Sequence, residues 1–537
     1  MNTPRIDSAP SGTLDVLVIG AGISGLYQLY RLTQTDLTFA AVEAGSGVGG
    51  TWYWNRYPGA RFDSESYTYA FFFSKELREE WSWSEHFAGQ PEIESYLNHV
   101  ADRFDLRKYI TFDTRVTAMD FDEDTHTWKV TTANGDVIHA RFVITGIGML
   151  SAPQYPPVPG IDDFRGVSAH TGLWPQEGVD VAGKKVAVIG TGSTGVQVIS
   201  AIAGEVGSLT VYQRTPNWCT PLNNAPITDE EQEQIKSTMD QLHESLKSSF
   251  AGFMHNFAPV EAGAVSHEER LKFWEQLYNA PGFAKLLGNY MQVMTDKVYN
   301  REFSDFVESK IRTRVHDPKV ADLLVPDHGY GAKRPPFETN YYEVYNQPNV
   351  ELVDLRTTPI TKITETGIET TEGTEDFDVI IYATGFDAIT GAYDRIDITA
   401  GGASLNSAWE DGPFTFVGAS APGFPNLFFL VGPHSSSGNV PRMSERQVDF
   451  VTGTLGEAVR RGATRVEATF EAAKEWTDHV YELNSTSLAA EEKIDYTYGT
   501  NTPGKKIVFR HYDGGLAGLN AKMTAVEDSS YAGFEFK

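Results

Sequence analysis

LDVLVIGAGISGLYQLYRL, residues 14–32, begins with an apolar run that is typical of a buried parallel strand. Gly20, Gly22 and Gly25 follow in the spacing GxGxxG, and apolar residues then recur at helical intervals. A strand, this glycine loop and a helix in succession predict a Rossmann-like dinucleotide-binding fold, with a tight turn that binds no ligand as the alternative. The next apolar run ends on Glu43, whose carboxylate can accept hydrogen bonds from ribose hydroxyls and repels a 2′-phosphate. The loop is therefore expected to bind FAD or NAD.

A second stretch, KKVAVIGTGSTGVQVISAI at residues 184–202, repeats this pattern with Gly190, Gly192 and Gly195. The apolar run that follows it ends on Arg214 and Thr215, where the first loop has an acid. A cation and a hydroxyl at this point suit a 2′-phosphate, which predicts NADPH as the second cofactor. The alternative is an exposed arginine at the end of a strand.

The composition excludes several classes of protein. With 537 residues the chain is long enough for several domains, and its formal net charge of -28 disfavours binding to nucleic acid or to an anionic membrane. Cys219 is the single cysteine, so neither a disulfide nor a dithiol relay is possible within the chain. No cluster of metal ligands is evident, and the N-terminal residues lack the apolar core of a signal peptide. A cytoplasmic protein without a metal site is expected.

The expected fold class is α/β, with two Rossmann-like domains for FAD and NADP and a helical insertion. Residues 229–250, 266–280 and 304–324 have helical apolar spacing and mostly acidic starts, which predicts the insertion. Whether it only buries one face of the second fold or also covers the active site stays open. The expected boundaries are 1–150 for the first part of the FAD-binding domain, 151–180 for an interdomain linker, 181–224 for the first part of the NADP-binding domain, 225–330 for the insertion, 331–385 for the second part of the NADP-binding domain, and 386–537 for the second part of the FAD-binding domain.

Two dinucleotide folds in one chain indicate that hydride passes from a nicotinamide to a flavin. The next electron acceptor is not a dithiol, because Cys219 has no partner cysteine. Oxygen is the remaining common acceptor, so the expected class is a flavin-dependent monooxygenase.

The segment between the two glycine loops carries a further motif. FRGVSAHTGLWP fits the pattern FxGxxxHxxxWP at Phe164, Gly166, His170 and Trp174, and residues 49–63 fit GGxWxxxxYPGxxxD. With these motifs the chain resembles the type I Baeyer–Villiger monooxygenases over essentially its whole length, within the group that acts on cyclic ketones. The resemblance implies that the linker motif transmits domain rotation, so His170 is expected to be a structural residue and not a metal ligand.

The resemblance also implies the chemistry. NADPH reduces the flavin, oxygen forms a C4a-peroxyflavin, and this species converts a ketone to an ester or lactone. Arg334 falls on the catalytic arginine of the family, Asp63 on the carboxylate that positions it, and Lys333 on a cation that shares the 2′-phosphate with Arg214. The expected cofactor-binding residues are Gly20, Gly22, Gly25, Glu43, Gly50, Thr51, Trp52, Asp63, Tyr69, Val116, Gly190, Thr191, Gly192, Ser193, Thr194, Gly195, Gln197, Arg214, Thr215, Lys333, Arg334 and Tyr496.

One position departs from the family pattern, because Tyr496 stands where related enzymes often have a tryptophan. The expected substrate pocket comprises Met149, Leu150, Ser437, Val440 and His511. Small residues at 435–438 suggest a roomy pocket for a bulky cyclic ketone. Two alternatives remain open: a flavin monooxygenase that acts on nitrogen or sulfur, and a non-catalytic redox sensor that binds NADPH and FAD. The sequence does not indicate the oligomeric state.

Overall fold

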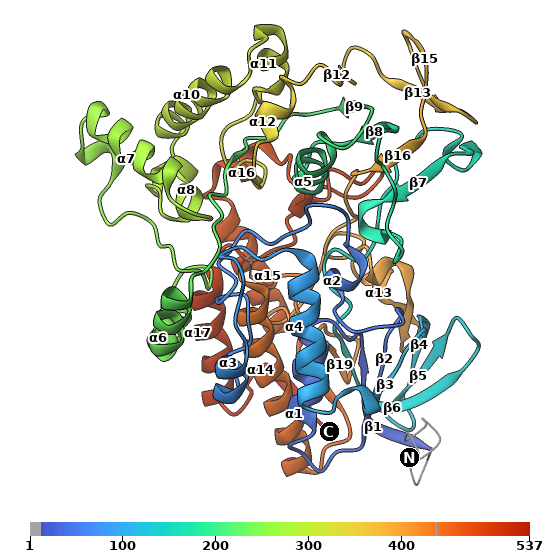
Figure 1. The fold of residues 1–537 in the computed structure, drawn as a ribbon. Coiled ribbons are helices and arrows are strands. Elements are labelled where there is room, and N and C mark those ends of the chain that lie inside the picture. The colour runs from blue at the N-terminus through green and yellow to red at the C-terminus, as the bar shows by residue number, and fades with distance from the viewer. Residues whose placement is uncertain (1–11, 437) are drawn as a thin grey trace.

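The computed structural model describes residues 12–436 and 438–537, which form two α/β units around separate sheets (Figure 1). Among these described residues, no helix has both the length and the apolar character required to cross a membrane. The chain builds part of the first unit, crosses to the second, and then returns to finish the first.

The first unit contains a nine-stranded sheet with the order β18-β17-β4-β5-β6-β1-β2-β3, and β19 pairs with β6. The first glycine loop leaves the central strand β1, which runs parallel to both β2 and β6. Its strands are β1 (Thr13–Ile19), β2 (Phe39–Val42), β3 (Ile110–Thr111), β4 (Val116–Asp122), β5 (Thr127–Thr132), β6 (Val137–Thr145), β17 (Asp397–Ala400), β18 (Ala403–Ser404) and β19 (Leu427–Phe429).

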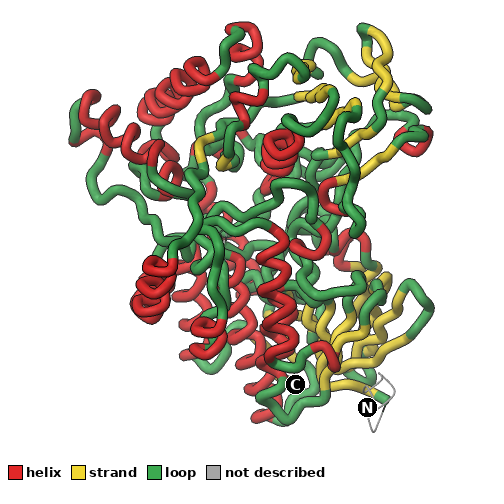
Figure 2. Tube along the Cα trace, in the orientation of Figure 1, coloured by secondary structure: helices red, strands yellow, loops and turns green. Residues whose placement is uncertain are grey.

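Helices from both ends of the chain complete this unit. Figure 2 shows a group of helices beside the sheet, and in Figure 1 they carry blue and orange to red colours from the two ends. Buried residues of α1 and α14 belong to one apolar cluster. The helices are α1 (Ile23–Leu32), α2 (Thr51–Trp54), α3 (Lys75–Glu80), α4 (Gln90–Arg103), α14 (Val440–Arg461), α15 (Phe470–Asn484) and α17 (Gly515–Asp528). Helix α16 (Leu488–Glu492) instead lies against the second unit, where Glu491 pairs with Lys297 at 2.6 Å. The short sheet of β20 (Val466–Ala468) and β21 (Phe534–Phe536) lies in the same part of the chain.

The second unit has a five-stranded sheet with the order β12-β9-β8-β16-β7, and all of its pairings are parallel. The second glycine loop joins the central strand β8 to helix α5 (Ser193–Ile202). The strands are β7 (Val167–His170), β8 (Lys185–Ile189), β9 (Ser208–Gln213), β12 (Val350–Asp354) and β16 (Val379–Tyr382). A small antiparallel sheet of β13 (Ile360–Ile363), β14 (Gly367–Thr370) and β15 (Gly373–Asp376) lies between β12 and β16 in the chain.

Strand β7 lies within the expected interdomain linker, residues 151–180. Its residues Val167–His170 pair with β16 as an edge strand of the second sheet. An edge position explains the polar sequence, because one side of such a strand remains open to solvent.

The helical insertion divides between the two units. Helices α7 (His267–Asn279) and α10 (Lys297–Arg314) contribute Trp274, Phe303 and Val307 to the core of the second unit. Helix α6 (Asp229–Ser248) instead lies against the first unit, where His243 stacks on Phe72 with ring centroids 4.6 Å apart. The acidic starts of α6 and α7 form capping boxes, in which a glutamate and a hydroxyl satisfy free N–H groups. The remaining helices of the insertion are α8 (Ala284–Leu287), α9 (Gln292–Thr295) and α11 (Pro318–Leu324).

The linker motif FxGxxxHxxxWP packs tightly around its glycine. A Cβ atom on Gly166 would lie 2.5 Å from Cζ of Phe164 and 2.7 Å from the carbonyl oxygen of Asp378. At the other end the N–H of Trp174 donates to the carbonyl of Trp54 at 3.2 Å, which joins the motif to the first unit. The motif therefore connects a strand of one unit to a helix of the other.

His170 is buried and neutral in this arrangement. Its Nδ1 accepts from the N–H of Gly172 at 2.9 Å, and its Nε2 lies 3.3 Å from the carbonyl of Gln154. Burial lowers the pKa of His170 to about 4. The neutral ring with a proton on Nε2 satisfies both contacts, which fits a structural role.

We expect His170→Gln to lose stability at pH 7, with a gap to the wild-type protein that narrows as the pH falls. The pKa of His170 is about 4 in the folded protein and about 6.5 in the unfolded chain. Between these pH values the unfolded chain binds a proton that the folded protein does not, so the stability of the wild type falls as the pH is lowered. The gap should shrink by up to roughly 3 kcal/mol, since each pKa unit corresponds to about 1.4 kcal/mol. Thermal unfolding of both proteins across this range measures it; a constant gap would contradict a neutral His170.

Candidate active site

A single cavity of about 1410 Å³ lies between the two units and receives both glycine loops. The expected cofactor residues that line it are Gly20, Gly22, Glu43, Gly50, Thr51, Trp52, Asp63, Tyr69, Val116, Gly190, Thr191, Gly192, Ser193, Thr194, Gln197, Arg214, Thr215, Lys333, Arg334 and Tyr496. Met149, Leu150, Val440 and His511 of the expected substrate pocket line it as well. Ser437 lies outside the described residues.

Two of the expected cofactor glycines do not line the cavity. A Cβ atom on Gly25 would lie 1.9 Å from the carbonyl oxygen of Gly20, and one on Gly195 would lie 2.2 Å from that of Gly190. In each loop the third glycine therefore lets the helix pack against the preceding strand, and the first two face the ligand space.

The first glycine loop and Glu43 lie together at the cavity. Glu43 is buried, and its two carboxylate oxygens accept from the N–H groups of Ala21 at 2.7 Å and Gly45 at 2.8 Å. Burial raises its pKa, and these N–H groups oppose that shift. A Cβ atom on Gly50 would come within 2.9 Å of the Cα of Gly22, so glycine alone permits the two loops to meet here. The close approach of the two glycine segments and a buried acid that lines the cavity fit the adenosine end of FAD.

The second loop lies beside a group of cations. Arg214 and Thr215 follow β9 directly, and Thr191 of the glycine loop donates to the carbonyl of Thr215 at 3.3 Å. Burial lowers the pKa of Lys333, and the neighbouring charge of Arg214 lowers it further, while Asp495 raises it. Arg214 is exposed and Lys333 is half-buried, and both line the cavity. Two neighbouring cations favour a bound anion, so these residues fit a 2′-phosphate.

Arg334 joins the two units at the centre of the cavity. One guanidinium nitrogen donates to Oδ2 of Asp63 at 2.6 Å, and the other donates to Oγ of Ser193 at 3.0 Å. Burial acts to lower the pKa of Arg334, but Asp63, Tyr496 and Asp495 together outweigh this effect and the pKa is raised. The predicted pair of arginine and carboxylate therefore lies across the junction, with Asp63 from the first unit and Ser193 from the second.

Asp63 is fixed and largely enclosed. It is 3% exposed, and its Oδ1 is buried without a hydrogen-bond partner among the described residues. Burial raises its pKa, and Arg334 opposes that shift. Gln197 of α5 holds the same loop, because it accepts from Tyr57 at 2.7 Å and donates to the carbonyl of Arg61 at 3.0 Å. The carboxylate is therefore positioned by both units.

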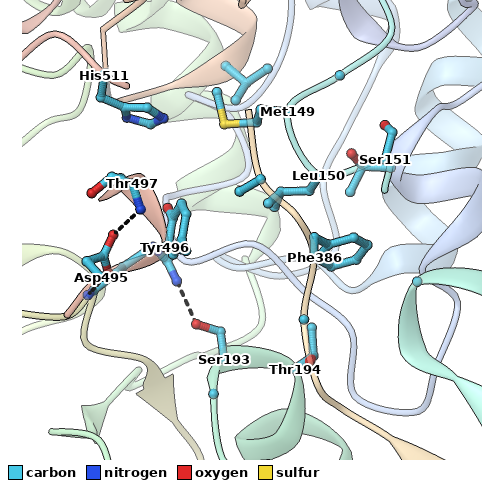
Figure 3. Close-up of a pocket in the computed structure, with 18 of the residues that line it drawn as sticks. Met149, Leu150, Ser151, Ser193, Thr194, Phe386, Asp495, Tyr496, Thr497 and His511 are labelled. Atoms are coloured by element: carbon cyan, nitrogen blue, oxygen red, sulfur yellow. Dashed lines mark hydrogen bonds between the residues drawn. The ribbon is translucent and has the colours of Figure 1, made fainter. Parts of the chain in front are cut away.

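Tyr496 and the expected pocket residues face the same space. Figure 3 shows Met149, Leu150, Tyr496 and His511 around one part of the cavity. Burial, with the charge of Asp495, raises the pKa of Tyr496 to about 12, so its hydroxyl remains protonated. Burial lowers the pKa of His511 to about 4, so its ring is neutral near pH 7.

The structure gives another reason for the small residues that it describes between 435 and 438. Ser435 and Ser436 are buried and do not line the cavity. Gly438 does line it, but a Cβ atom there would lie 2.4 Å from the carbonyl oxygen of Ala251. This glycine is explained by the close approach of the insertion and not by space for a ligand.

Sequence reasoning left one further part of the site open and missed another. The insertion supplies an apolar wall, to which Phe250, Phe257, Leu286, Met291 and Met294 contribute. Asp495 accepts a hydrogen bond from the main chain of Arg334 at 3.0 Å. Aromatic residues and methionines in the insertion were a usable signal for the wall, but nothing in the local sequence marks Asp495.

Comparisons with known proteins agree with this architecture. A family model described as pyridine nucleotide-disulphide oxidoreductase matches residues 17–276. The chain is 44% identical over 540 residues to 2-oxo-Delta(3)-4,5,5-trimethylcyclopentenylacetyl-CoA monooxygenase from Pseudomonas putida, covering 98% of this chain and 99% of the relative. It is 38% identical over 524 residues to a phenazine N-monooxygenase from Lysobacter antibioticus, covering 97% of this chain and 96% of that protein.

A solved structure matches to the same extent. The crystal structure of the OTEMO complex with FAD and NADP superimposes with a TM-score of 0.94 at 44% identity, over 98% of this chain and 99% of the other. The disulphide chemistry in the name of the family model does not apply, because this chain has one cysteine. The chain belongs to the Baeyer–Villiger monooxygenases, the FAD- and NADPH-dependent family that its two long motifs resemble.

Proposed function

We propose that this protein uses NADPH and O2 to convert a cyclic ketone to an ester or lactone, with FAD bound along the first glycine loop. The observation that supports this most strongly is Arg334, which lies where both dinucleotide sites open into one cavity and is held by Asp63 and Ser193. A fixed cation at this point suits chemistry in which negative charge develops on oxygen.

The two cofactors have separate binding residues. Gly20, Gly22, Glu43 and Gly50 would hold the adenosine and pyrophosphate of FAD, while Arg214, Thr215 and Lys333 would hold the 2′-phosphate of NADPH. When bound, FAD accepts a hydride from NADPH and activates O2 for transfer to the substrate.

The side chains of this protein orient and stabilise the reacting groups. Asp63 and Ser193 each engage a different nitrogen of Arg334, which fixes the plane of the guanidinium. The free N–H donors of the guanidinium can then stabilise the negative charge that develops on the carbonyl oxygen when the carbonyl carbon of the ketone is attacked. The apolar wall from the insertion excludes water, which strengthens these electrostatic contacts.

The substrate is proposed to be a bulky, largely apolar cyclic ketone. The support is the wall formed by Phe250, Phe257, Leu286, Met291 and Met294, which adds aromatic and flexible side chains to the cavity. The relative from Pseudomonas putida is named for the CoA thioester of a trimethylcyclopentenyl ketone, and only the ring part of that molecule is of the same kind.

Oxidation of nitrogen is the second candidate, because a relative with 38% identity is a phenazine N-monooxygenase. The complete linker motif and the Arg334–Asp63 pair favour the ketone reaction, since a fixed cation stabilises an anionic oxygen nucleophile. A non-catalytic sensor would have no need for this pair.

The enzyme loaded with FAD, supplied with NADPH and isotopically labelled O2, should convert cyclic ketones to esters that carry one labelled oxygen. Mass spectrometry of the products from cyclohexanone, a bicyclic ketone and phenazine separates the candidates. We expect the bicyclic ketone to be turned over with the higher kcat/KM. Equal turnover of both ketones would contradict the proposal on size, and an N-oxide without any ester would favour the second candidate.

Arg334→Ala should reduce ester formation by at least roughly a hundredfold, because loss of one oxyanion donor typically costs this much in kcat. NADPH should still reduce the flavin in this variant. Arg460→Ala serves as the control, since that exposed arginine pairs with Glu457 on α14 and does not line the cavity. Product yield and anaerobic flavin reduction measure the two steps, and a normal ester yield from Arg334→Ala would remove this residue from the reaction.

Arg214→Ala should raise KM for NADPH by roughly ten- to a hundredfold, as expected for the loss of one charged hydrogen bond. The KM for NADH, which lacks the 2′-phosphate, should change little and acts as an internal control. Steady-state oxidation of both nucleotides gives the ratio. An unchanged preference for NADPH would place the 2′-phosphate elsewhere.

A further inference from the structure

Asp495 connects two segments of the site that are far apart in sequence. Its Oδ2 accepts from the main-chain N–H of Arg334 at 3.0 Å, across a sequence separation of 161 residues. Its Oδ1 accepts from the N–H of Thr497 at 3.0 Å, a bond drawn in Figure 3. This second bond caps the 3-10 helix η7 (Tyr496–Tyr498), which carries Tyr496. The two oxygens of one carboxylate thus accept hydrogen bonds from two different segments of the main chain.

The surroundings leave little freedom for this carboxylate. Asp495 is 8% exposed and lines the cavity. Its main-chain carbonyl accepts from Oγ1 of Thr500 at 3.0 Å and from the N–H of Tyr498 at 3.1 Å, so the turn is held from both sides. A buried residue with this many fixed contacts defines the position of whatever it binds.

The segment of Arg334 is also held at its carbonyl. Nδ2 of Asn217, which follows β9 and Arg214 in the chain, donates to the carbonyl of Arg334 at 3.0 Å. Asp495 therefore fixes the N–H of this residue and Asn217 fixes its carbonyl. The first of these bonds joins Arg334 to the C-terminal part of the chain, and the second joins it to the second unit.

The charge of Asp495 acts on the same groups. The carboxylate raises the pKa of Lys333 against the effects of burial and of Arg214, and it is among the groups that raise the pKa of Arg334. A neutral side chain at position 495 would leave the positive charges of Lys333 and Arg334 with less opposite charge nearby. Geometry and charge therefore point to the same partner segment.

We infer that Asp495 is a positioning residue, which locks the main chain of Arg334 to the turn that carries Tyr496 so that the two move as one unit. The inference rests on the proposed role of Arg334 in the reaction. It gives the Tyr496 segment a function besides contact with a ligand, because that segment sets the position of the arginine.

The chemistry of the side chain makes the inference specific. Asparagine has the shape of aspartate but only one acceptor oxygen, and its amide nitrogen is a donor. In Asp495→Asn one of the two main-chain N–H groups must therefore face an NH2 group. Serine has a single oxygen that can cap the turn at Thr497 but offers none to Arg334.

The test is hydrogen–deuterium exchange of the enzyme loaded with FAD and saturated with NADP+, read over residues 330–338 and 495–500. In Asp495→Asn we expect exchange in at least one of these segments to rise roughly tenfold or more. In Asp495→Ser exchange should rise in 330–338 while 495–500 stays protected. The matched control is Asp411→Asn, the same chemical change at an exposed acid that pairs with Lys506.

Catalysis provides the second readout. In Asp495→Asn a larger share of the NADPH consumed should appear as hydrogen peroxide instead of ester, with KM for NADPH changed less than kcat. Unchanged exchange in both segments of Asp495→Asn, or continued protection of 330–338 in Asp495→Ser, would overturn the inference. The exchange measurement needs no ketone, so it stands even where no ester is formed and the proposed function fails.

Discussion

A carboxylate buried at the junction of two units is the constraint on which the site depends. Asp63 is 3% exposed, and the charged group that meets it is Arg334. Charge buried in this way is tolerated when it is paired and hydrogen-bonded, so the two units must meet with these residues aligned. Ser193 and Gln197, both on α5, extend the alignment to the second glycine loop. One ion pair thereby fixes the positions of the two nucleotide sites relative to each other.

Glycines provide the steric conditions for this alignment. In both loops the third glycine allows the helix to approach the carbonyl of the first, where a Cβ atom would overlap. Gly59 allows a similar close approach between the two units, since a Cβ atom there would lie 2.7 Å from the carbonyl oxygen of Gln197. Gly59 belongs to the motif that ends at Asp63, so one short segment supplies both the close contact and the charge.

Local patterns were sufficient to predict the parts of the site that depend on local structure. The glycine loops, Glu43 and Arg214 follow from spacing within single segments, and the resemblance added the linker motif, Arg334 and Asp63. Features that arise from tertiary contacts were missed or misread: β7 as an edge strand, α6 on the first unit, and Gly438 against Ala251. Asp495 belongs to this group, because its partner Arg334 is 161 residues away and no periodic pattern relates them.

The charge of the whole chain and the charge of the site have opposite signs. The formal net charge of -28 repels an anionic dinucleotide at long range, but salt screens that repulsion beyond about 8 Å at physiological ionic strength. At the cavity Arg214 lies near Lys333, and the half-buried Lys333 and Arg334 are less screened than charges on the open surface. Binding is therefore governed by the local cations. Asp495 supports the charge of Lys333 among them, which links cofactor binding and the position of Arg334 through one carboxylate.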